Sequence, residues 1–234
     1  MKKVIPILKE RAIYVALIAL FIIFSCLSSD FLSPNNLINI ARQIAVLGIA
    51  SVGMTYVILI GGIDLSTGSI ITFVNIIAAY LMVNMGMNMW LAILIALLSS
   101  TAIGFLNGLL VANMNIPSLI VTFASQTIFE GFAYILSKGM PIFGFPKGFA
   151  TIGQGYVGFI PIPVIVMIVI FLIGGFILNK TYFGRYFYAL GGNETAAQMA
   201  GIQVKRVKYL IFSLSGLFAG IAGIIMLART NSGQ

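Results

Sequence analysis

Long stretches without a charged residue dominate the chain, and they predict helices that cross a membrane. These stretches cover residues 12–29, 65–129, 148–179 and 209–228. A helix needs about 20 apolar residues to cross a hydrocarbon core of roughly 30 Å, so turns must divide the longer stretches. Clusters of Gly, Pro, Asn and Asp, which interrupt helices, supply these divisions. The pattern predicts seven spans, near residues 12–29, 44–61, 69–84, 89–112, 117–137, 161–179 and 209–228.

The composition excludes most classes of soluble protein. Of the 234 residues, 60% are hydrophobic and 8% are charged, whereas soluble domains carry about 25% charged residues. The chain has no His and a single Cys, Cys26. Metal sites built from His and acid–base catalysis by His are therefore excluded. We expect no metal, no cofactor and no enzyme activity. The predicted fold is all-α, a polytopic membrane helical bundle that occupies residues 1–234 as a single domain.

The distribution of basic residues predicts the orientation of the chain. If the N-terminus is cytoplasmic, the inner segments are 1–11, 62–68, 113–116 and 180–208. They contain Lys2, Lys3, Lys9, Arg11, Lys180, Arg185, Lys205, Arg206 and Lys208, whereas the outer segments contain Arg42, Lys138, Lys147 and Arg229. Lys and Arg are enriched on the cytoplasmic side of membrane proteins, so a cytoplasmic N-terminus is favoured. The net charge of +8 then reflects membrane topology and anionic lipid, and no nucleic-acid partner is expected.

Charges are nearly absent from the predicted spans. Asp64 lies in a break between spans, and Glu130 is the acid that lies clearly inside one. Ion-coupled transporters and voltage sensors usually depend on buried charges, so this scarcity argues against them. The sequence also lacks the GxxxxGK[ST] pattern of a P-loop, so any ATP hydrolysis would belong to another subunit. An ion-coupled secondary transporter stays open as an alternative, because neutral oxygens at the Gly61–Gly68 break can build a broken-helix ion site.

The inner segment 180–208 contains a predicted helix that is too short to span a membrane. Asn193 is a good N-cap, Glu194 follows at the positive end of the helix dipole, and Gly201 suits the C-terminal stop. A helix of about seven residues is roughly 10 Å long. Its alanines at 196, 197 and 200 form a small-residue face that another protein could approach. A helix that only connects two spans is an equally good interpretation of these residues.

Two long motifs, at residues 52–69 and 184–202, make the chain resemble the permease subunits of ribose-type sugar ABC importers. The resemblance implies a subunit of the bacterial inner membrane that carries a ribose-like monosaccharide by alternating access. It implies a second permease chain, identical or different. It also implies two ATP-binding-cassette ATPase domains inside and a sugar-binding protein outside. Such permeases have about ten spans, so the resemblance predicts a chain that is incomplete at its C-terminus, and an inactive truncated permease is a further alternative.

The resemblance assigns one candidate site to the short inner helix. By this resemblance the segment docks on the ATPase and couples ATP use to transport. The residues implied are Gly191, Gly192, Asn193, Glu194, Ala196, Ala197 and Gly201.

Polar residues in or next to the spans form a second candidate site, the translocation path. They are Asp64, Ser66, Asn107 and Gln126. A sugar path needs hydrogen-bond donors and acceptors more than charges. Helix capping by Asp64 and interhelical hydrogen bonds of Asn107 and Gln126 are equally compatible with these residue types.

Two glycine pairs predict close contact between helices. Gly104 and Gly108 form one pair, and Gly216 and Gly220 form the other. Small residues four apart let helix backbones approach closely in membranes. We expect packing within one subunit, with contact between two subunits as the alternative.

Overall fold

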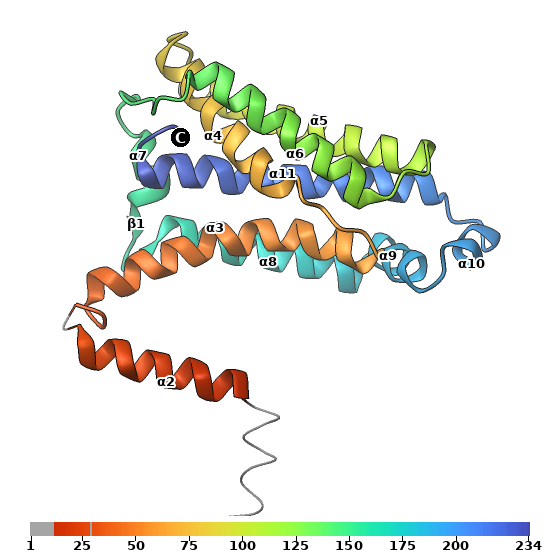
Figure 1. Ribbon diagram of the computed structural model, residues 1–234, viewed down its shortest axis with the longest axis horizontal. Coiled ribbons are helices and arrows are strands. Elements are labelled where there is room, and N and C mark those ends of the chain that lie inside the picture. Colours follow the sequence, from red (N-terminus) through yellow and green to blue (C-terminus); the bar gives the residue numbers. More distant parts are fainter. Residues whose placement is uncertain (1–11, 29) are drawn as a thin grey trace, which may run out of the picture. The chain divides into compact units, whose positions relative to one another are not determined.

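The structure, a computed structural model, describes residues 12–28 and 30–234 (Figure 1). The chain divides into two units, one that ends at Ala41 and one that covers Arg42–Gln234. The boundary falls inside helix α3 (Pro34–Leu59). Four of the basic residues behind the predicted orientation, at positions 2, 3, 9 and 11, lie outside the described residues. The cytoplasmic N-terminus therefore stays a prediction.

The first unit contains α2 (Ala12–Leu27) and the start of α3. Aromatic contacts hold the turn between them, because the Phe31 ring lies 5.3 Å from that of Phe21 and 5.9 Å from that of Phe24, centroid to centroid. The side-chain amide of Asn36 donates to the Phe31 carbonyl at 2.7 Å. A turn therefore separates the first two predicted spans, and α3 begins at Pro34, a residue type that suits the first helical position.

The second unit is a helical bundle with a small hairpin at one end (Figure 1). After α3, its elements are α4 (Thr67–Val83), α5 (Met89–Asn113), α6 (Ser118–Ser137), α7 (Phe149–Gln154), β1 (Tyr156–Val157), β2 (Ile160–Pro161), α8 (Ile162–Lys180), α9 (Tyr182–Gly192), α10 (Glu194–Met199) and α11 (Val204–Thr230). The two strands pair in antiparallel fashion. We call the extremity that carries α7 and the hairpin the α7 end, and the opposite extremity the α10 end.

Each predicted span coincides with a helix. Among the described residues, five helices are long and apolar enough to cross a membrane, namely α3, α5, α6, α8 and α11. The apolar helices α2 and α4 are shorter. The predicted boundaries were too narrow for α3 and α11, because Arg42 and the basic residues near 205 were taken as span limits although charged residues do not end a helix. The segment 180–208 contains α9 as well as the expected α10, so the prediction of one helix there was incomplete.

Helix α11 forms the centre of the second unit and packs tightly on α5. A Cβ added at Gly216 would lie 3.1 Å from the Gly104 Cα, and one added at Gly108 would lie 3.0 Å from the Lys208 carbonyl oxygen. A Cβ at Gly104 would overlap the Phe212 carbonyl, and one at Gly220 would overlap the Ser100 hydroxyl. The two glycine pairs therefore lie at one contact within a single chain, as the predicted packing within one subunit requires; that they contact each other was not predicted.

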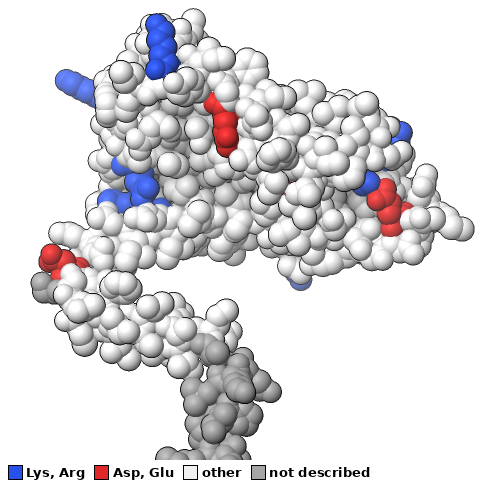
Figure 2. All heavy atoms as spheres, viewed as in Figure 1, with Lys and Arg blue, Asp and Glu red and all other residues white. Residues whose placement is uncertain are grey.

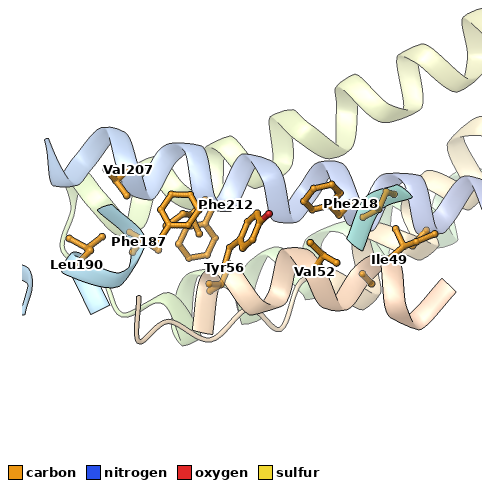
Figure 3. Packing of buried hydrophobic residues seen from close by; sticks show 14 of the residues in the cluster. Ile49, Val52, Tyr56, Phe187, Leu190, Val207, Phe212 and Phe218 are labelled. Atoms are coloured by element: carbon orange, nitrogen blue, oxygen red, sulfur yellow. The ribbon is translucent and has the colours of Figure 1, made fainter. Parts of the chain in front are cut away.

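A second contact joins α11 to α3, and the buried ring of Tyr56 lies at its centre (Figure 3). The Tyr56 ring is 5.4 Å from that of Phe187 on α9 and 6.1 Å from that of Phe218 on α11. Its hydroxyl donates to the Gly174 carbonyl of α8 at 3.1 Å. One side chain thus joins four helices, and α9 is anchored in the same hydrophobic cluster as the spans.

We expect Gly104→Ala to destabilise the bundle by about 1–3 kcal/mol, because an added methyl group at this contact must push α5 and α11 apart. Thermal unfolding of the purified protein in detergent measures the effect. Gly131→Ala on α6 is the matched control, because a Cβ there meets no atom within 4 Å and alanine favours a helix. Equal losses in the two variants would contradict close packing at Gly104.

Candidate functional site

The chain between α3 and α4 is not helical, and its polar side chains Asp64 and Ser66 are buried in the bundle whereas Ile63 and Leu65 are exposed. Gly61, with φ +74°, ends α3. Two hydroxyls of α6 receive the amides that follow: Ile63 N–H donates to Ser118 Oγ at 3.0 Å and Leu65 N–H to Thr122 Oγ1 at 3.1 Å. Irregular backbone at membrane depth is tolerated where protein satisfies its polar groups. The segment 62–68, predicted as an inner turn, is therefore the entry into α4, which explains why α4 is short.

A hub of hydrogen bonds forms around the Asp64 carboxylate, which is 2% exposed. Its Oδ1 accepts from the amide and the hydroxyl of Ser66. Its Oδ2 accepts from Ser215 Oγ of α11 at 2.8 Å, and Asn107 Nδ2 of α5 donates to Ser66 Oγ at 3.0 Å. The hub joins the start of α4 to α5 and α11. Within the ranges that the structure covers, no Lys or Arg pairs with Asp64.

Three of the four predicted path residues thus meet in one place. Asp64, Ser66 and Asn107 are buried and hydrogen-bonded to one another or to Ser215. Their burial supports the alternative interpretation as interhelical contacts, and their role in a path stays a prediction. Gln126 does not join them: its Nε2 donates to Glu130 Oε1 at 3.0 Å along α6.

Sequence reasoning missed Ser118, Thr122 and Ser215. Each is a hydroxyl residue in an apolar helix, a type that also forms bonds to the preceding turn of its own helix. Ser215 could nevertheless have been identified, because it directly precedes Gly216, a residue predicted to lie at a contact between helices. Ser118 and Thr122 lie four apart and therefore on one face of α6.

The predicted short inner helix is present as α10. Asn193 Oδ1 accepts from Ala196 N–H at 2.9 Å, which caps the helix, and Gly201 follows with φ +83°. Gly191, the penultimate residue of α9, lies beside the end of α3, where a Cβ would overlap the Leu59 carbonyl. Gly191 therefore lets α9 cross α3, whereas the surroundings of Gly192 are open.

An ion pair attaches α10 to α11. Lys208 Nζ lies 2.7 Å from Glu194 Oε1, with side chains 13% and 52% exposed. Lys208 is followed by the α11 residues that contact α5, so the pair connects the short helix to the central contact of the bundle. The pair lies at the rim of a cavity of about 330 Å³. The cavity is lined by the α3–α4 break, the α5–α6 turn, α10 and α11.

The exposed face of α10 differs from the predicted one. Ala197 is 4% exposed and packs in the hydrophobic core, because a helix of one and a half turns that rests on the bundle must bury one side. Ala196 and Ala200 remain exposed, as predicted. Met199, which was not singled out, is 85% exposed and is the largest apolar side chain on this face.

The acid-bearing residues do not gather into a metal centre. In the described part of the chain no group of three His, Cys, Asp or Glu side chains is close enough to hold a metal ion. The site offers hydrogen bonding, an ion pair and an exposed face on α10.

Comparison with known proteins gives the family of the chain. A family model described as the branched-chain amino acid transport system / permease component matches residues 36–234. A ribose import permease protein, RbsC, of Haemophilus influenzae is 42% identical over 96% of this chain and 71% of its own length. RbsC of Bacillus subtilis is 40% identical over 97% and 71%.

A more distant relative is an L-arabinose ABC transporter permease protein, AraH, of Azospirillum brasilense, 34% identical over 97% of this chain and 67% of its own length. No solved structure matches the chain. The family match begins at the start of α3 and includes the α3–α4 break, α10 and α11. The chain therefore belongs to the family of membrane permease components of ABC transport systems.

Proposed function

We propose that the chain is the membrane-spanning subunit of a bacterial ABC importer for a monosaccharide such as ribose. The relatives named as ribose and arabinose permeases support the substrate class. In this proposal ATP is hydrolysed by separate ATPase subunits on the cytoplasmic side, and a binding protein delivers the sugar from outside. A second permease chain, identical or related, completes the path in the inner membrane.

The observation that carries the proposal is the attachment of α10 to the bundle. Its exposed residues, including Ala196 and Met199, form a docking face for the ATPase. Its buried side, through Ala197 and the Glu194–Lys208 pair, rests on the helices that cross the membrane. A push on α10 by the ATPase therefore reaches α11 directly.

Helix α11 also reaches the break before α4. Ser215 lies seven residues after Lys208, about 10 Å further along the helix, and it bonds to Asp64. We infer that movement of α10 shifts α11 and thereby the buried hub. Asp64, Ser66 and Asn107 act in this proposal as the joint that moves the wall of the path.

The polar residues that face away from the bundle core are better candidates for direct sugar contact. Gln126 is half-buried and Glu130 is exposed on α6, and they bond to each other. Polar groups at membrane depth face protein or a water-filled cavity, because lipid leaves them unsatisfied. We propose that this side of α6 faces the path or the second permease chain.

The proposal is tested by reconstituting the chain with its ATPase and its binding protein in liposomes. ATP-dependent sugar uptake is expected, and Glu194→Lys should reduce it by about tenfold, the effect of about 1.4 kcal/mol on a rate. The charge exchange Glu194→Lys with Lys208→Glu should restore most of the uptake. The control is Lys205→Glu, which changes an exposed basic residue on the same helix as Lys208.

Uptake driven by an ion gradient without the ATPase would contradict the proposed importer. A different result bears on the role of the pair: if the charge exchange fails to restore uptake while the ATPase still binds, Glu194 contacts the ATPase directly instead of holding α10 on α11.

We also expect Ser215→Ala to lower the free energy of unfolding by about 1–3 kcal/mol, because it leaves a buried carboxylate oxygen of Asp64 without its donor. Ser213→Ala is the matched control, since the Ser213 hydroxyl bonds to the Tyr209 carbonyl of its own helix at 2.7 Å. Thermal unfolding in detergent compares the two variants. If Ser215→Ala left the free energy of unfolding unchanged, the hub would not hold α11 to the start of α4 and would have no part in the proposed mechanism.

A further inference from the structure

Two arginines from different helices are attached to the same short element at the α7 end. Arg42 of α3 donates to the main-chain carbonyl of Gln154, the last residue of α7. The Gln154 side-chain amide donates to the carbonyl of Arg229, in the last turn of α11, at 3.0 Å. Gly153 allows this approach, because a Cβ there would overlap the main chain of Arg229. Figure 2 shows Lys and Arg atoms gathered where Figure 1 places α7 and β1.

Neither arginine is neutralised by the chain as far as the structure describes it. Over residues 12–28 and 30–234, the ion pair within 4.0 Å is the one between Lys208 and Glu194. The Nε atoms of Arg42 and Arg229 are shielded from solvent and find no hydrogen-bond acceptor in these ranges. A buried charged donor without an acceptor is costly. The two side chains therefore carry positive charge and unsatisfied donors on either side of Gln154, which both residues contact.

The α7 end carries aromatic residues that are typical of a membrane interface. The Arg42 guanidinium lies 4.8 Å from the centroid of the Tyr156 ring. Trp90 at the start of α5 and Tyr134 near the end of α6 are 65% and 69% exposed at the same end of the bundle. Exposed Trp and Tyr mark the headgroup level of a bilayer, so this is the depth at which lipid phosphates lie.

Apolar surface continues from the arginines toward the membrane interior. The hairpin that follows α7 exposes Val157 and Phe159, the latter by 87%. It leads into α8, the least buried of the five long helices, with Leu172 and Phe176 exposed. A soluble acidic partner would match the charges but leave this apolar surface uncovered, whereas a lipid matches both.

We propose that Arg42 and Arg229 bind the phosphate of an anionic phospholipid, whose acyl chains lie against the hairpin and α8. The planar guanidinium fork suits the oxygens of a phosphate and binds them with charge-assisted hydrogen bonds. Such a lipid supplies the acceptors for both arginines and fixes α3, α7 and α11 to one another. The site is independent of the direction in which the chain crosses the membrane.

The test is native mass spectrometry of the full chain in detergent, titrated with phosphatidylglycerol or with phosphatidylcholine of the same acyl chains. We expect phosphatidylglycerol to be retained preferentially. Arg42→Gln with Arg229→Gln should weaken its apparent affinity by about tenfold or more, since each basic residue contributes separately to anionic-lipid binding. Lys147→Gln changes an exposed basic residue two positions before α7 and should leave the affinity unchanged.

A second variant tests the lipid site in a protein that stays folded, in case the double arginine variant loses its fold. Phe159→Ser changes a side chain that makes little contact with the protein, so the bundle stays folded. It should weaken the retention of both lipids by a few-fold, because acyl chains lose an apolar contact.

Three results would overturn the proposal. The first is phosphatidylglycerol retention that does not change in the double arginine variant. The second is full competition by inorganic phosphate alone, which would make this a site for a free anion. The third is a double variant that keeps its lipid but loses its binding to the purified sugar-binding protein, which would assign the arginines to a protein interface.

Discussion

The need to satisfy the polar groups of the non-helical chain between α3 and α4 governs the centre of this structure. The chain from Ile63 to Ser66 enters the bundle without helical hydrogen bonds. Two hydroxyls of α6 accept hydrogen bonds from two of its backbone amides. The Asp64 carboxylate is stabilised by three donors instead of a cation. A bilayer core offers no water to replace a missing partner, so α4, α6 and α11 must hold their relative positions for this segment to exist.

Close packing at glycines is what allows α11 to serve as the common element. With Gly104 against Gly216, α5 and α11 approach until Asn107 and Ser215 both reach the break. The other side of α11 holds Phe212 and Phe218 against Tyr56 and Phe187. Each end of the helix then carries a different attachment, α10 through Lys208 and α7 through Arg229.

Sequence patterns predicted the spans, the short helix α10 and the glycine contact, because each depends on residues that are near one another in the chain. Charge runs were poorer guides to helix ends, since Arg42 lies inside α3 and the basic residues after 204 lie inside α11. The hub was only half predicted. Asp64, Ser66 and Asn107 could be identified as polar residues in apolar surroundings, but their partner Ser215 depends on tertiary packing. The burial of Ala197 likewise follows from how α10 rests on its neighbours.

The distance along the chain between Asp64 and its partner has a consequence for biosynthesis. Ser215 follows Asp64 by 151 residues, so the seven helices from α4 to α10 must be synthesised before α11 can donate to the carboxylate. Until then an ionised Asp64 in lipid would be expensive, and the segment must stay in contact with water or with the insertion machinery. We therefore expect α4 to reach its final depth only after α11 has been synthesised.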